Sequence, residues 1–397
     1  MLKRILGEGF RTFFLLAPLW AILAMSIWLV WLWGQGLGGG SVLRGPVMPP
    51  HLWHGHEMVH GYGSAVMAGF LLTAVAKGRR GFIAGAAALW LAGRLAFWLS
   101  GSLNPWLVAV VDLAFLPLLG GHLVLTVLHR KSPQHLLFLV FVAAMVVGDI
   151  LSHLDLLGVV ANVIETGQRM GLLALCSLIA IIAGRVVPGF VRNAMKRAGL
   201  PEARWPAPVP MLGRVIIVAG VVLPWLAMWR TGAGAVAAVL AVAVAIRLWR
   251  WHPLFTRGDP LLWSLMVAQA ALAAGLALWA LAQFGIGSEI GALHVLGIGA
   301  VGGMTLAVMS RAVLAHTGRA LKAPGPVVYS YGGVAIAVAA RWGASALAEA
   351  WYYPLVLLSG GLWIVAFGLF VAGLIGPLTA PRRNKPPVGP PPPIPGE

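Results

Sequence analysis

Four histidines gather between His51 and His60, in the run His-Leu-Trp-His-Gly-His-Glu-Met-Val-His, directly before an apolar stretch that starts at Gly61. Imidazole is the commonest metal ligand in proteins and a frequent axial ligand of haem iron. His56 and His60 are four residues apart, so on a helix they share a face and can approach one metal. His54 and His56 converge only if the chain is extended there. Imidazole ligands favour copper, iron or zinc over magnesium or calcium.

The composition places this histidine cluster in a membrane protein. Of the 397 residues, 60% are hydrophobic and only 10% are charged, whereas soluble domains carry about 25% charged residues. The net charge of +17 lies in short clusters between apolar stretches, which indicates topogenic charge and argues against a nucleic-acid partner. Cys176 is the only cysteine, which excludes an intramolecular disulfide and a cysteine-ligated cluster. The lipid bilayer is therefore the expected surroundings of most of the chain.

Apolar runs of about 20 residues predict an all-α fold, a polytopic transmembrane helical bundle of about twelve membrane-spanning helices. The predicted spans are 12–33, 57–76, 81–100, 105–128, 134–152, 166–188, 212–229, 233–249, 260–283, 290–313, 326–347 and 352–375. With this assignment, most of the 28 Lys and Arg residues fall in alternate loops on one side of the membrane. The positive-inside bias then predicts that both termini are cytoplasmic.

The longest predicted loop divides the chain. We expect a single membrane domain, residues 1–380, made of two six-helix halves, 1–190 and 210–380, that a proline-containing cytoplasmic loop joins. Residues 381–397 are polar and rich in proline, and this composition predicts a disordered tail with extended polyproline II character.

Several ionisable residues fall in the outer part of the predicted bundle. Such residues are costly in a membrane unless they are paired, hydrated or bound to something, so a group of them is a functional-site hypothesis. Three histidine-bearing helices reach a similar depth, which predicts a site on the outer side. The residues concerned are His54, His56, Glu57 and His60 of the second span, Arg94 and Asp112 of the third and fourth, Asp149 and His153 of the fifth, and His294 of the tenth.

The opposite, cytoplasmic ends of the sixth and tenth spans carry arginines. They lie in the runs 184–193 and 310–319. Arginines at such positions commonly extend toward lipid headgroups. Their similar placement on two helices also fits paired helix ends or a contact with an anion.

Several motifs together resemble those of the NnrS family, in the same order along the chain. They are Trp53-His54-Gly55-His56-Glu57-Met58 with Gly61-Tyr62 and the run 68–75, Gly184-Arg185-Val186-Val187-Pro188 with Arg192-Asn193, Ala292-Leu293-His294 with Gly302-Gly303-Met304, and the run 309–319. The resemblance implies a polytopic protein of the bacterial inner (cytoplasmic) membrane that contains haem and copper and is linked to nitric oxide metabolism or stress.

The resemblance also implies roles for individual residues. It suggests that His54, His56 and His294 bind the cofactors, with His153 next, and His60 remains a metal candidate through its spacing from His56. Glu57, Asp112 and Asp149 are the carboxylates placed to relay protons from the outer face, and are therefore the catalytic candidates.

We therefore expect a haem- and copper-binding protein of nitric oxide metabolism or stress defence. It would bind nitric oxide at a periplasm-side haem site. Reduction to nitrous oxide would also need protons and an electron donor that the sequence does not identify. One alternative is a secondary transporter, which the six-plus-six organisation suits but the apolar centres of the spans disfavour. Another is a sensor that binds haem or copper without turnover.

Overall fold

The computed structural model describes residues 1–36, 45–75, 79–130 and 136–383. Within these ranges the chain forms helices and short connections, with no β-strand. The predicted disordered tail lies outside the described residues from residue 384 onward. So do Lys77 and Lys131, which fall in two of the loops predicted to be cytoplasmic.

The described α-helices follow one another as α1 (Leu2–Ile5), α2 (Gly9–Gly36), α3 (Pro50–His56), α4 (Ser64–Val75), α5 (Arg80–Trp98), α6 (Pro105–Leu113), α7 (Phe115–Arg130), α8 (Leu136–Leu156), α9 (Ile164–Arg197), α10 (Pro210–Val222), α11 (Arg230–Trp249), α12 (Pro260–Gln283), α13 (Glu289–His294), α14 (Gly303–His316), α15 (Gly325–Ala346) and α16 (Tyr352–Thr379). Two π-helices, η1 (Glu57–Gly63) and η6 (Val295–Gly302), continue α3 into α4 and α13 into α14. Short 3₁₀ segments are η3 (Glu202–Arg204), η4 (Leu223–Leu226), η5 (Pro253–Gly258) and η7 (Glu349–Trp351).

Nine helical stretches of the described residues are long and apolar enough to cross a membrane. Lipid offers no hydrogen-bond partner to a peptide group, so a spanning segment must satisfy its backbone internally, as a helix does. The predicted all-α polytopic bundle is therefore confirmed. The three other predicted spans, 57–76, 212–229 and 326–347, are also largely helical. The number of twelve crossings, the two halves and the cytoplasmic termini remain predictions.

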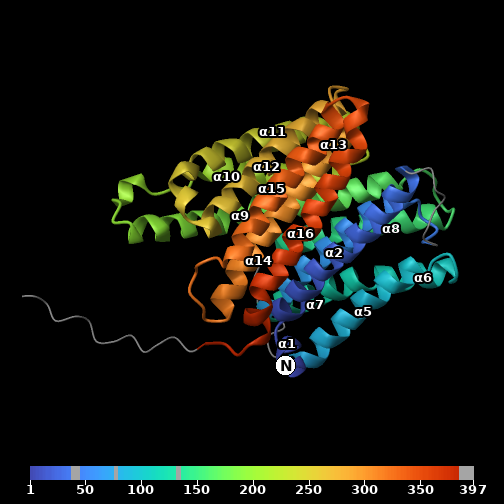
Figure 1. Cartoon of the computed structure of the whole chain (residues 1–397), viewed down its shortest axis with the longest axis horizontal. Helices are drawn as coiled ribbons and strands as arrows, with labels where there is room; N and C mark the ends of the chain where they lie inside the picture. Colours follow the sequence, from blue (N-terminus) through green and yellow to red (C-terminus); the bar gives the residue numbers. More distant parts are fainter. Residues whose placement is uncertain (37–44, 76–78, 131–135, 384–397) are drawn as a thin grey trace, which may run out of the picture.

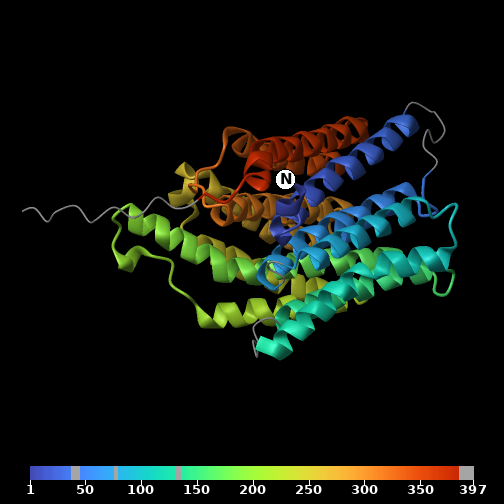
Figure 2. The ribbon, with the colours of Figure 1, turned by 90° about the horizontal axis from the view of Figure 1, so that it is seen from below.

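The first and last long helices pack together and join the two ends of the chain. In Figure 1, α2 runs alongside α16, and the two helices are in contact. Arg11 Nη1 donates hydrogen bonds to the carbonyls at the end of α16, including that of Leu378 at 2.6 Å. Figure 2 shows the N-terminus beside the segment that follows α16, where Arg4 Nη1 donates to the Thr379 carbonyl. Residues far apart in sequence thus close the bundle.

Glycines let α8 and α9 approach almost backbone to backbone. A Cβ atom built on Gly148 would lie 2.4 Å from the Gly167 carbonyl oxygen, and one on Gly167 would lie 2.1 Å from the Gly148 oxygen. Both distances are shorter than any real contact, so only glycine fits at either position. Small residues allow the same close packing in many membrane bundles. Asp149 and His153 follow Gly148 on α8, so this contact fixes their position.

The two π-helices follow directly after helices that carry histidines. A π-helical segment is rare and is frequently found at functional sites. In η1, a Cβ on Gly61 would lie 2.6 Å from Trp20 Nε1 and 2.5 Å from Glu57 Oε2, so glycine leaves room for that pair to meet. In η6, a Cβ on Gly302 would lie 2.6 Å from the Trp363 ring. Both segments therefore combine unusual backbone with close packing.

The α8–α9 contact predicts the effect of adding one methyl group. Gly148→Ala should lower the free energy of unfolding by about 1–3 kcal/mol, because overpacking forces the two backbones apart. Thermal unfolding of the detergent-purified protein measures the change. The control is Gly121→Ala in α7, where a Cβ meets no atom within 4 Å. This control should be neutral or slightly stabilising. Equal melting temperatures for the two variants would contradict the proposed packing constraint.

Candidate metal centre

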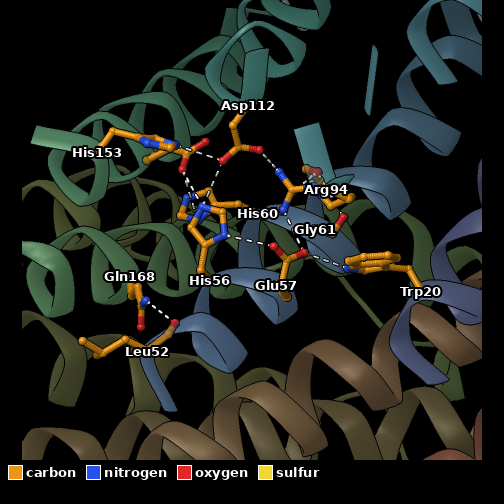
Figure 3. A network of polar contacts seen from close by, with 12 residues as sticks. Trp20, Leu52, His56, Glu57, His60, Gly61, Arg94, Asp112, His153 and Gln168 are labelled. Carbon is orange, nitrogen blue, oxygen red and sulfur yellow. Dashed lines mark hydrogen bonds and ion pairs between the residues drawn. The ribbon is translucent and has the colours of Figure 1, made fainter. Parts of the chain in front are cut away.

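A buried group of ionisable side chains occupies the junction of α3, η1, α5, α6 and α8 (Figure 3). His56 ends α3, Glu57 begins η1, and Asp112 projects from α6. Asp149 and His153 are four residues apart on α8, so they share a face of that helix. The side chains of the group are at most 3% exposed. Helices from separate parts of the chain thus bring these groups together.

Arg94 of α5 connects two of the carboxylates. Its Nη1 lies 2.9 Å from Glu57 Oε2, and its Nη2 donates to Asp112 Oδ1. Trp20 Nε1 also donates to Glu57 Oε2, at 2.8 Å. The ion pairs are almost completely shielded from water, so the loss of either partner would leave a buried charge uncompensated and would be costly.

The imidazoles lie against the other side of the carboxylates. His56 Nε2 is 2.9 Å from Asp149 Oδ1 and 3.4 Å from Asp112 Oδ2. His153 Nε2 is 2.9 Å from Asp112 Oδ2. An ionised carboxylate only accepts hydrogen bonds, so the imidazole N–H groups donate in these contacts. The ring of Phe97 stacks on His56, with centroids 4.3 Å apart, and holds its orientation.

Four of these residues have the geometry of a metal site. One potential ligand atom from each of His56, Asp112, Asp149 and His153 lies within 4.8 Å of the other three. His60 sits beside them, its ring centroid 5.0 Å from that of His56. Both ring nitrogens of His60 are buried without a hydrogen bond to any described residue. A buried nitrogen that lacks a hydrogen bond is costly unless something else binds it.

The charges of the group do not balance. Glu57, Asp112 and Asp149 are carboxylates, and Arg94 is the cation that pairs with them. With the histidines neutral, two negative charges remain in a cluster almost closed to water. Uncompensated charge in a membrane interior is strongly unfavourable. The cluster therefore needs positive charge, which either protonated imidazoles or a bound divalent cation can supply.

His54 and His294, a second pair of predicted ligands, lie outside this cluster. His54 stacks on Trp28 with ring centroids 5.0 Å apart, and its buried Nδ1 has no hydrogen bond to a described residue. His294 Nδ1 donates to the Ile290 carbonyl at 2.7 Å. The two histidines lie within electrostatic range of each other, and Arg341 is within range of both. Arg341 is 6% exposed, and no described carboxylate lies within salt-bridge distance of it.

The structure divides the predicted site residues between these two places. His56, Glu57, His60, Asp112, Asp149 and His153 come together in the first cluster. His54 and His294, predicted to share a pocket with them, lie with Arg341 instead. Arg94 was predicted to lie at the depth of the site but not to pair with its carboxylates, although a charged residue within an apolar span is itself a signal. Phe97 and Trp20 carry no such signal, because aromatic residues are common in membrane spans.

The helical bundle and the buried histidine–carboxylate cluster define a polytopic membrane protein with a candidate transition-metal centre. The model of the NnrS protein family matches residues 4–382, nearly the whole chain. The chain therefore belongs to the NnrS family, and the resemblance noted from its motifs is confirmed. This membership associates it with nitric oxide. No curated protein matches the chain.

The Arg94 contacts predict a large loss of stability when this cation is removed. Arg94→Ala leaves Glu57 and Asp112 buried without their partner, so unfolding should become easier by about 3–5 kcal/mol. The control is Arg230→Ala, whose side chain is 64% exposed beside Glu289. That exposed pair should contribute less than about 1 kcal/mol. The melting temperatures of the two variants measure this difference. A similar small change in both would show that the Arg94 ion pairs do not stabilise the fold.

Proposed function

We propose that this NnrS-family protein binds copper at His56, Asp112, Asp149 and His153, and haem at His54 and His294, and that it acts on nitric oxide. The observation that carries the proposal is a cluster of three carboxylates with one arginine and several imidazole nitrogens beside them, which leaves two negative charges when the histidines are neutral. A divalent cation that accepts both imidazole and carboxylate ligands would neutralise it.

The donor set fits copper. Mixed imidazole and carboxylate ligands suit copper and other first-row metals, whereas magnesium prefers oxygen ligands alone. His56 and His153 would supply nitrogen, and Asp112 and Asp149 would supply oxygen or orient the imidazoles as hydrogen-bond partners. His60, with both nitrogens unbonded, offers a further ligand from the adjacent turn.

The second pair fits haem. The hydrogen bond from His294 Nδ1 to Ile290 fixes the tautomer that leaves Nε2 free to bind a metal. His54 has a buried nitrogen that needs a partner. Arg341 is a buried guanidinium without a carboxylate partner among the described residues, and it suits the carboxylate groups that haem carries.

Haem held at His54 or His294 would supply iron that coordinates nitric oxide, and bound copper would supply a second redox-active metal. The protein's own residues would supply protons. His56 lies within 3.4 Å of carboxylate oxygens of Glu57, Asp112 and Asp149. His153 also contacts Asp112. These contacts can pass a proton between the carboxylates in a site that excludes bulk water. The electron donor is a separate partner.

Copper content tests the first assignment. His153→Ala and Asp149→Asn should each lower the copper bound per protein to roughly a tenth or less of the unsubstituted level, because each removes a ligand or the group that orients one. Elemental analysis of the purified variants measures this. His129→Ala is the matched control, since His129 is an exposed histidine of α7 that lies outside the cluster. Copper retained in full by both site variants would eliminate this centre.

The two sites should respond to substitution independently. His294→Ala and His54→Ala should reduce the Soret absorbance of protein expressed with ample haem, whereas His56→Ala should remove copper and leave that absorbance. Loss of haem in His56→Ala, with loss of copper in His294→Ala and His54→Ala, would contradict the proposed assignment of the two cofactors. Anaerobic consumption of nitric oxide by the purified protein, supplied with a defined electron donor, then distinguishes a reductase from a sensor that binds without turnover.

A further inference from the structure

A cavity of about 310 Å³ lies at the arginine-rich end of the bundle, far along α9 from the histidine clusters. The C-terminal parts of α9 and α11 and the start of α10 line it, together with the proline-rich segment 206–210. In Figures 1 and 2, the connection from α9 to α10 projects beyond the other helices at this end. The charge distribution predicts that it faces the cytoplasm.

Four arginines line this cavity, and no acidic residue does. They are Arg185, Arg192, Arg247 and Arg250. No carboxylate of the described residues lies within 4.0 Å of their guanidinium nitrogens, in contrast to Arg11, Arg94, Arg169 and Arg230, which all form ion pairs. The positive charge of the cavity is thus uncompensated within the described chain.

Among the four arginines, Arg247 is the one whose position is not explained by contact with water or lipid headgroups. Exposed arginines at a membrane boundary extend their head groups toward water and lipid headgroups, which accounts for the other three. Arg247 is only 9% exposed. Its Nη2 donates to Gln269 Oε1 at 3.0 Å and its guanidinium lies 4.9 Å from the Trp251 ring, yet its buried Nε has no partner. A buried, incompletely bonded cation that lines a cavity favours an anionic ligand.

The backbone around Arg247 also favours an anionic ligand. Gly184 of α9 allows Arg247 to lie close, because a Cβ there would be 2.7 Å from Nη1. Helix α10 begins at the cavity with Pro210, and its N-cap residue Val209 makes no side-chain capping hydrogen bond. The first turn of a helix presents free N–H groups and partial positive charge, both favourable to an anion.

We infer that this cavity binds the phosphate group of an anionic ligand, with the guanidinium groups and the start of α10 as its hydrogen-bond donors. Arginine pairs with phosphate oxygens through two parallel hydrogen bonds. Basic pockets between membrane helices at the cytoplasmic side suit anionic lipid headgroups. The apolar wall, which includes Ile181, Ile216 and Ile217, would contact the uncharged part of such a molecule. This assignment is independent of the proposed cofactors.

The test uses the intact protein purified in detergent. One arm adds phosphatidylglycerol or phosphatidylcholine and measures bound lipid by native mass spectrometry. The other arm adds inorganic phosphate or pyrophosphate and measures heat of binding. We expect phosphatidylglycerol to bind more tightly than phosphatidylcholine, and Arg185→Gln and Arg192→Gln each to weaken that binding about tenfold. Both residues are exposed, so these variants should fold normally. Arg247→Gln should weaken it further.

The control is Arg214→Gln. Arg214 is an exposed arginine of the same α10 end, but its side chain is not part of the cavity lining. Loss of binding in the cavity variants with near-normal binding in this control supports the site. Binding in the lipid arm alone identifies a headgroup, and binding in the soluble arm alone identifies a free phosphate compound. Equal weakening in Arg214→Gln, equal binding of both lipids with no phosphate binding, or no binding in either arm would overturn the inference.

Discussion

The arrangement of the metal centre depends on Arg94 between Glu57 and Asp112. In an apolar bundle, carboxylates from η1 and α6 would repel each other and resist burial unless a cation lies between them. Arg94 fixes both, and through Asp112 it also positions His153 and His56. The guanidinium does not neutralise the cluster, and the remaining negative charge is what makes the site a candidate for a bound cation. Structure and proposed chemistry therefore rest on the same imbalance of charge.

Glycine residues determine how closely the helices that bear these charged side chains can approach one another. Gly148 and Gly167 bring α8 onto α9, and Gly61 leaves space for Trp20 to reach Glu57. The π-helices η1 and η6 follow His56 and His294 directly, so the two histidine-bearing helices share a local irregularity. At the opposite end, Gly184 gives Arg247 its place beside α9. The metal centre and the arginine-lined cavity thus each place a charged side chain beside a glycine.

Hydropathy alone predicted the all-α membrane fold, because a spanning segment must be both apolar and helical. The histidine motif and the carboxylates at matching depths also predicted most of the members of the central cluster. The sequence left the division between His56 and His54 open, because these two residues converge only in an extended chain. The structure forms helix α3 there, so the two imidazoles diverge. The role of Arg94 was hidden for a related reason. Its partners lie on other helices, and linear spacing carries no information about helix rotation.

The proposed function rests on copper bound between two imidazoles and nearby carboxylates. X-ray absorption at the copper edge of the purified, metal-loaded protein tests it most directly, because it reports the type of ligand atoms at the metal. We expect a shell of nitrogen and oxygen only, with the multiple scattering that imidazole rings give. A sulfur ligand from Cys176 or a methionine, or a shell without imidazole scattering, would contradict it.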